Sequence, residues 1–312
     1  MAITGSGTQA DPYLVTTIGE VLEKCAETGA YVCLANDIYV KEDPDYKEGI
    51  STPFTINCAK FYSENTGTGY KNIYGFRCDG YTAVHTIQAG ANTLVDHIGF
   101  LSFFTDKNGI NSYNDGNFYD IYCDSTSNFT NCSFSMFISR GVYGAISPII
   151  YGGNFTECSF YIRCNKTDLS IISGNIICYG IISPTKILNS YICLEDIYIQ
   201  SLNANTDEVI KNVYSSTINV QNLNFISING FYSNNSLALL KDSSNVICYM
   251  DIFYTDNTDF SGFTFSTTSS ALCVNFLPGS ATRGVTYTNS GSFYATKDQM
   301  RDRQFLLDNG FI

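Results

Sequence analysis

Acidic residues have the clearest potential for catalysis in this sequence, because several of them lie close together along the chain. Hydrolysis of a glycosidic bond needs two carboxyl groups, about 5–5.5 Å apart for retention and about 6.5–9.5 Å apart for inversion. The candidate catalytic residues are Asp115, Asp120, Asp124, Asp251 and Asp256. Further acidic pairs are Glu195 with Asp196 and Asp207 with Glu208. With 29 acidic residues in the chain, such groupings also arise by chance, and solvated turn carboxylates are the alternative interpretation.

The sequence predicts no metal site and no cofactor. It contains two histidines, His85 and His97, and none of its 12 cysteines belongs to a C-x-x-C pair, whereas zinc needs several such ligands at short spacing. Lyase chemistry of the calcium-dependent kind needs an ordered carboxylate cluster and a base. Arg140 and Arg163 have no such cluster beside them in the sequence. We therefore expect both histidines to be turn or core residues.

Tyrosine offers a second kind of chemistry, because an aromatic face can stack on a sugar ring. The chain has 23 Tyr and no Trp. The candidate carbohydrate-binding residues are Tyr62, Tyr70, Tyr74, Tyr81, Tyr113 and Tyr119. The alternative is that these tyrosines simply pack on the faces of β-sheets, where aromatic residues are favoured.

Charge excludes several partner classes. The net charge is −12, so the surface repels nucleic acid and anionic lipid. No stretch of about 20 apolar residues could span a membrane. The N-terminal residues have neither a basic nor an apolar signal region, so we expect no secretory signal. We expect the cysteines to be buried, reduced thiols in a protein made in a reducing cytoplasm.

Helical patterns occur near the two ends of the chain. Thr17 and Glu20 form a capping box, and the apolar spacing that follows predicts a helix over residues 18–28. A second capping box at Thr296 predicts a C-terminal helix over residues 296–309. This helix has little chain after it, so we expect it to contact a neighbouring molecule. The candidate assembly residues are Met300, Phe305, Leu306 and Phe311.

Between these helices the sequence reads as short β-strands, and part of it repeats. Residues 128–134 read NFTNCSF and residues 154–160 read NFTECSF, a spacing of 26 residues. Such a repeat suits one coil of a β-solenoid, in which equivalent side chains stack inward. The sequence thus predicts an all-β, right-handed parallel β-helix with Cys132, Phe134, Cys158 and Phe160 inside. A β-sandwich is the alternative fold, and a propeller fits less well because its blades are longer.

This interpretation divides the chain into three parts. Residues 1–40 form an N-terminal cap of a helix and a first strand. Residues 41–295 form the parallel β-helix, with continuous strands expected over ranges such as 94–104, 132–138 and 158–164. Residues 296–312 form a C-terminal docking or capping helix. An amphipathic helix before a long β array can cover the open end of the stack.

The two ends of the chain carry a resemblance. The opening GSGTQADPYLV followed by YVCLANDI, and the ending ATKDQMRDRQFLLDNGF, resemble right-handed parallel β-helix proteins of phage tailspikes and appendages and of bacterial surfaces. The resemblance implies a virion structural or adhesive protein, a fibre, spike or appendage subunit that displays a β-helix to a host surface or glycan. It would be a homo-oligomer, a trimer, bound to other virion proteins. The alternatives are a host-glycan depolymerase, either a glycoside hydrolase or a lyase, and a bacterial surface adhesin.

Overall fold

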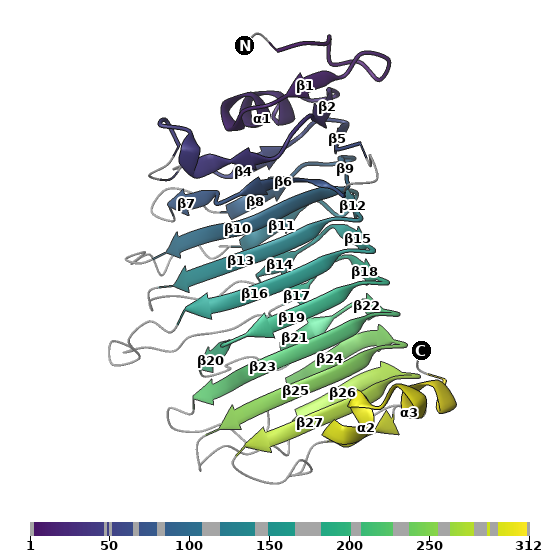
Figure 1. Cartoon of the computed structure of the whole chain (residues 1–312). Coiled ribbons are helices and arrows are strands. Elements are labelled where there is room, and N and C mark those ends of the chain that lie inside the picture. Colours follow the sequence, from purple (N-terminus) through teal and green to yellow (C-terminus); the bar gives the residue numbers. More distant parts are fainter. Residues whose placement is uncertain are drawn as a thin grey trace.

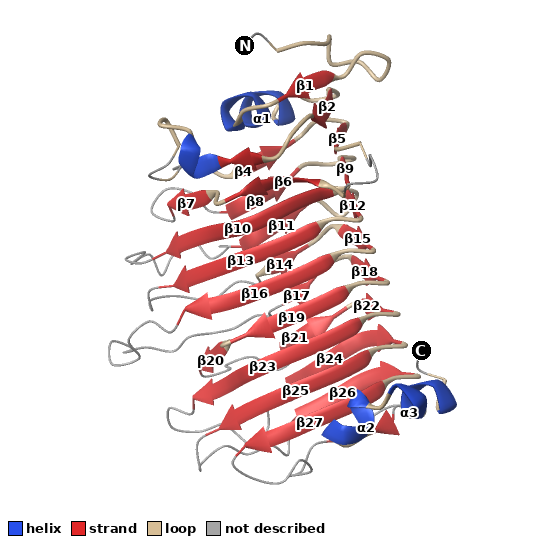
Figure 2. Ribbon diagram, in the orientation of Figure 1, coloured by secondary structure: helices blue, strands red, loops and turns tan. Residues whose placement is uncertain are grey.

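The computed structural model describes most of the chain. The described residues are 3–46, 49, 52–64, 69–79, 85–107, 119–140, 149–165, 182–200, 207–226, 237–254, 263–277, 286–287 and 293–310. Within them the protein is mostly β and is built from two long parallel sheets, the arrangement of an all-β parallel solenoid (Figures 1 and 2). Strands that follow one another along each sheet belong to successive passes of the chain, so the sequence progresses from one end of the stack to the other (Figure 1).

The first sheet contains seventeen of the described strands. They are β1 (Tyr13–Val15), β2 (Tyr31–Leu34), β4 (Phe54–Ile56), β5 (Lys60–Tyr62), β8 (His85–Ala89), β9 (Leu94–Asp96), β11 (Tyr119–Cys123), β12 (Asn128–Thr130), β14 (Ile150–Tyr151), β15 (Asn154–Thr156), β17 (Ile182–Ser183), β18 (Lys186–Leu188), β21 (Asp207–Lys211), β22 (Val213–Tyr214), β24 (Leu237–Ser244), β26 (Phe263–Thr268) and β28 (Thr286–Tyr287).

The second sheet contains twelve of the described strands, most of them longer. They are β3 (Ile38–Tyr39), β6 (Lys71–Tyr74), β7 (Arg77–Asp79), β10 (Ile98–Lys107), β13 (Ser133–Arg140), β16 (Ser159–Asn165), β19 (Tyr191–Glu195), β20 (Tyr198–Gln200), β23 (Thr217–Ile226), β25 (Ile247–Tyr254), β27 (Ala271–Leu277) and β29 (Phe293–Tyr294). A short 3-10 helix, η1 (Val40–Glu42), follows β3.

The core consists of columns of identical or similar side chains, one from each coil. Phe134 and Phe160 are in register on β13 and β16, and their rings stack 4.9 Å apart at an interplanar angle of 4°. Both rings are at most 1% exposed, and Cys132 and Cys158 are also buried. The predicted 26-residue repeat and its inward-facing residues are therefore confirmed. A second column on the first sheet contains Ile87, Ile121, Ile150, Ile182 and Ile210.

In seven of the described coils, a sharp corner joins the last strand of the first sheet to the next strand of the second. One residue at each corner has a left-handed backbone, with φ between 47° and 58°. These corner residues are His97, Asn131, Glu157, Asn189, Ser215, Asn245 and Ser269. The corner at His97 divides the strand expected over 94–104 into β9 and β10. Short polar side chains tolerate this backbone better than branched ones, so Asn and Ser recur here.

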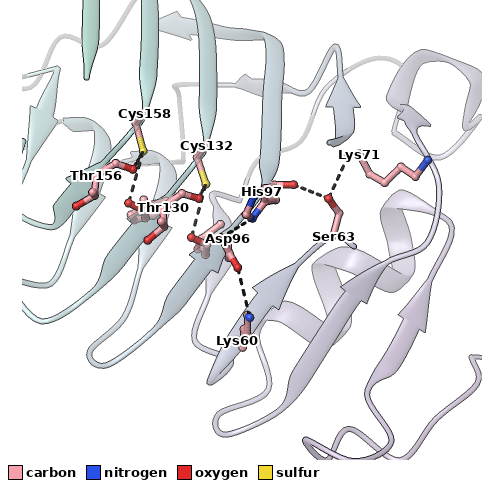
Figure 3. Close-up of polar contacts among 11 residues, drawn as sticks. Lys60, Ser63, Lys71, Asp96, His97, Thr130, Cys132, Thr156 and Cys158 are labelled. Carbon is pink, nitrogen blue, oxygen red and sulfur yellow. Dashed lines mark hydrogen bonds and ion pairs between the residues drawn. The ribbon is translucent and has the colours of Figure 1, made fainter. Parts of the chain in front are cut away.

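At five of these corners the next residue is a buried Cys or Ser (Cys132, Cys158, Ser190, Ser216 and Ser270), whereas Ile98 and Val246 follow the other two. The Cys132 and Cys158 thiols donate to the carbonyl oxygens of Thr130 and Thr156, each at 3.3 Å (Figure 3). Ser190 donates to the Leu188 carbonyl in the same way and accepts the backbone N–H of Cys158 at 3.0 Å. Ser216 and Ser270 repeat this pattern in later coils. Each hydroxyl thus ties its own corner to the preceding coil.

Helix α1 (Ile18–Cys25) covers the N-terminal end of the stack (Figure 1). The predicted Thr17–Glu20 capping box is present, and Ile18, Val21 and Cys25 are fully buried. The predicted end at residue 28 is wrong, because the helix ends at Cys25 and the chain turns through Gly29, at φ 82°.

The predicted C-terminal helix is divided into two. Helix α2 (Lys297–Arg301) begins at the predicted Thr296 capping box, and helix α3 (Arg303–Asp308) follows it. Asp302 separates them because its side chain accepts the N–H groups of Gln304 and Phe305 and so caps a new helix. Leu306 is 8% exposed, Met300 and Phe305 are half-buried, and Phe311 lies outside the described residues.

Ten of the twelve cysteines have described side chains, and all ten are buried free thiols. Burial raises the pKa of Cys123 and Cys248, the latter to about 12, which disfavours the reactive thiolate. These cysteines act as small apolar residues of the core, as the sequence predicts.

Candidate functional site

Among the described residues, the candidate aspartates Asp120, Asp124 and Asp251 do not form a catalytic pair. Asp120 is fully buried in β11, where a substrate cannot reach it. Asp124 lies in the turn after β11 and accepts the Thr126 hydroxyl and N–H at 2.7 and 2.8 Å, and these bonds lower the pKa of Asp124. This is the geometry of a structural turn carboxylate. Asp115 and Asp256 lie outside the described residues.

The described tyrosine candidates are Tyr62, Tyr70 and Tyr74, and each contacts a neighbouring side chain. The Tyr74 ring stacks on Tyr39 at 4.7 Å, and the Lys60 ammonium lies 4.7 Å from the centre of the Tyr62 ring. Tyr70 packs edge-on against His97.

The remaining tyrosine candidates are not placed in full. Tyr81 and Tyr113 lie outside the described residues, and for Tyr119 only its backbone in β11 is described.

A polar network lies instead on the outer face of the second sheet. Tyr161, Arg163 and Glu195 alternate with inward residues of β16 and β19 and point away from the core. The Tyr161 hydroxyl donates to Glu195 Oε2 at 2.6 Å, and Arg163 Nε donates to Asp196 Oδ2 at 3.1 Å. Asn222 donates to Asp196 Oδ1 at 2.9 Å. We call these five residues the Arg163 network.

Backbone geometry positions two members of this network. Asp196 and Asn222 both have a left-handed backbone, with φ of 55° and 58°, and they follow the paired residues Glu195 and Gln221. The same bend in successive coils therefore places the Asp196 carboxylate beside the Asn222 amide. The network remains accessible, because the Arg163 side chain is 48% exposed and those of Glu195 and Asp196 are 21% and 25% exposed.

Tyr191 forms an aromatic platform next to this network. It is the first residue of β19 and is 43% exposed. Its hydroxyl interacts with Asn219 and Cys193, and burial is the largest cause of the raised pKa of Tyr191. Cys193 is two residues along the same face yet only 4% exposed. The Tyr191 ring therefore lies along its strand and covers Cys193, and the residue remains 43% exposed to solvent.

The polar surface continues for two more coils. Tyr249 and Asp251 lie on β25, and the Tyr249 hydroxyl donates to Asp251 Oδ1 at 2.7 Å. Asn275 on β27 donates to the same oxygen at 2.9 Å, and the Lys297 ammonium lies 5.2 Å from the centre of the Tyr249 ring. The candidate Asp251 is thus a member of a polar surface on the second sheet, away from Asp120 and Asp124 on the first.

A second cluster surrounds His97 at its corner (Figure 3). His97 Nδ1 lies 2.6 Å from Asp96 Oδ1, and the Lys60 ammonium lies 3.4 Å from Asp96 Oδ2. The Ser63 hydroxyl donates to the backbone carbonyl of His97, not to its imidazole, and accepts the N–H of Lys71. Ser63 therefore supports the corner and is not a nucleophile activated by this histidine.

The two histidines differ in their surroundings. His97 is a turn residue, as predicted, whereas the prediction of a turn or core position is wrong for His85. His85 lies in β8, is partly exposed, and stacks on Tyr122 at 4.6 Å.

Comparison with models of protein families, with curated proteins and with solved structures found no match. Among the described residues, no three His, Cys, Asp or Glu side chains gather as ligands for a metal ion. No helix in the described part of the chain has the length and apolar character needed to cross a membrane.

Sequence reasoning identified Glu195, Asp196 and Asp251 as acidic groups but missed the aromatic partners Tyr161, Tyr191 and Tyr249. The alternation of outward-facing and inward-facing residues along each strand could have identified these tyrosines. In YICLE, the first, third and fifth residues share the outer face, which places Tyr191 and Glu195 together. The partners contributed by neighbouring coils could be found only once the register was known.

Proposed function

We propose that the chain is a right-handed parallel β-helix that acts as a virion structural and adhesive protein of a phage. It would be a fibre, spike or appendage subunit that binds a glycan of the host surface. The handedness follows from a general rule, since parallel strands joined by crossovers are right-handed in nearly all proteins. The phage assignment rests on the resemblance of both chain ends to tailspike and appendage proteins.

The single observation that carries the binding function is the exposed Tyr191 ring beside the Arg163 network. Protein sites for sugars combine an aromatic face, which packs on the apolar side of a pyranose, with side chains that bond to hydroxyl groups. Tyr191 supplies the face, and Arg163, Glu195 and Asp196 supply donors and acceptors that are already held in place. Such preorganisation lowers the entropic cost of binding.

An array of bacterial surface polysaccharides tests this proposal. We expect Tyr191→Ala to weaken binding about thirtyfold, because truncating a central aromatic contact costs about 2 kcal/mol. Tyr151→Ala is the matched control, since Tyr151 is also 43% exposed but lies on the first sheet. Equal binding by Tyr191→Ala and the unmodified protein, or loss only in the control, would contradict the proposal.

A second candidate function, glycan depolymerisation, is favoured by the contact between Asp96 and His97. A carboxylate at Nδ1 favours the proton on that nitrogen, which leaves Nε2 free to act as a base. The test is release of new chain ends from any polysaccharide that the protein binds. If the protein is a depolymerase, His97→Ala should abolish the release of chain ends while still binding the polysaccharide.

A further inference from the structure

We infer that the Arg163 network selects glycans without acidic groups, and that a free amino group on the sugar strengthens binding. This inference rests on the proposed function and adds the chemical class of the ligand. It follows from the charges of the network and from the pairing of its one guanidinium, that of Arg163, with acidic side chains.

The guanidinium of Arg163 is not available as a free cation. Its Nε donates to Asp196 at 3.1 Å and lies 4.0 Å from Glu195 Oε2. One positive and two negative groups leave the network with a net charge of −1. A guanidinium paired in this way donates hydrogen bonds to hydroxyl groups, but it does not create the positive field that captures a carboxylate, sulfate or phosphate.

Charged groups on the neighbouring coils do not reverse this sign in the part of the chain that the structure describes. Two coils away, Asp251 and Lys297 contribute one negative and one positive group to the same face. The whole chain has a net charge of −12. An acidic sugar on the Tyr191 ring would therefore meet net repulsion, whereas an ammonium group would meet the Glu195 and Asp196 carboxylates. At the distances of direct binding, one unit charge at a protein surface changes affinity by about tenfold.

The experiment measures binding of matched glycans to the full chain. One pair is oligogalacturonate and its methyl ester, which differ in the carboxylate charge, and the other is chitosan and chitin oligosaccharides, which differ in the free amine. The polysaccharide array gives the same comparison over many sugars grouped by charge. We expect the methyl ester to bind about tenfold more tightly than oligogalacturonate, and chitosan to bind about tenfold more tightly than chitin.

The double variant Glu195→Gln, Asp196→Asn tests the cause. Both side chains are partly exposed, so the fold tolerates the change, although the amide at position 196 accepts only one of the two hydrogen bonds that the Asp196 carboxylate accepts from Arg163 and Asn222. We expect the ratio of the affinities for neutral and acidic glycans to fall from about ten to near one in this variant, and this ratio is the readout because Glu195 and Asp196 also bond to neutral sugars.

Two results would overturn the inference, and they are distinguishable. Acidic glycans that bind as tightly as neutral ones, with both lost in Tyr191→Ala, would refute the charge selection and leave the proposed function standing. If no glycan binds, or if binding is indifferent to Tyr191→Ala, both the inference and the proposed function fail.

Discussion

The buried Cys and Ser column makes a sharp prediction at Ser190. In Ser190→Ala the N–H of Cys158 loses the hydroxyl that accepts it at 3.0 Å, and the site is 6% exposed, so water cannot replace it freely. Leaving one buried polar group unsatisfied costs about 1–3 kcal/mol. We therefore expect the free energy of unfolding to fall by that amount.

Ser190→Cys is the informative comparison. Cys132 and Cys158 occupy the same place in earlier coils and donate from sulfur to the carbonyl two residues before them. A thiol should therefore restore part of the lost stability, and we expect Ser190→Cys to lie between Ser190→Ala and the unmodified protein. Urea unfolding measures both, with exposed Ser125→Ala as a control expected to change stability by less than about 0.5 kcal/mol.

Two outcomes would refute this reasoning. If Ser190→Ala is as stable as Ser125→Ala, the hydroxyl does not link the coils. If Ser190→Cys is less stable than Ser190→Ala, Cys and Ser are not equivalent in the column.

Further predictions concern the core, alkaline pH and assembly. Phe160→Ala removes a fully buried ring stacked on Phe134 and should lower the free energy of unfolding by about 3–5 kcal/mol. A loss below about 1 kcal/mol, measured by urea unfolding, would count against the stacked column. The hydrogen bond to Glu195 raises the pKa of Tyr161 from 10 to about 12. This bond therefore stabilises the fold below pH 10, and the stabilisation is lost as the pH rises toward 12. Tyr161→Phe should therefore show a smaller alkaline loss of thermal stability, and an identical pH profile would exclude this linkage. We propose a homotrimer that assembles through the C-terminal helices. Deleting residues 296–312 should then weaken assembly, measured by sedimentation, while circular dichroism shows an intact β fold. Unchanged assembly of the truncated protein would argue against this role of the helices.

Much of the fold could be predicted from the sequence, because the same physical demand recurs in every coil. The NFTxCSF repeat predicted the inward residues of β13 and β16, since stacked coils require equivalent side chains at equivalent positions. Both capping boxes predicted helix starts, because capping depends on residues three apart in the sequence. The helix ends and the division at Asp302 were missed, because competing local hydrogen bonds decide them.

The candidate site was less predictable, because its residues come from different coils. Asp196 contacts Arg163 and Asn222, which are 33 and 26 residues away along the chain. Each position is unremarkable in sequence, and their proximity depends on the register and on the shared backbone bend. Asp120 shows the opposite case, in which a promising acidic residue lies inside the stack.

Hydroxyl-radical footprinting of the protein with and without its bound glycan tests the central claim most directly. We predict that the glycan protects Tyr161 and Tyr191 on the outer face of the second sheet, and leaves Tyr122 and Tyr151 on the first sheet as reactive as before. Protection of Tyr122 and Tyr151 with no change at Tyr191 would contradict it, because the glycan would then bind on the wrong sheet.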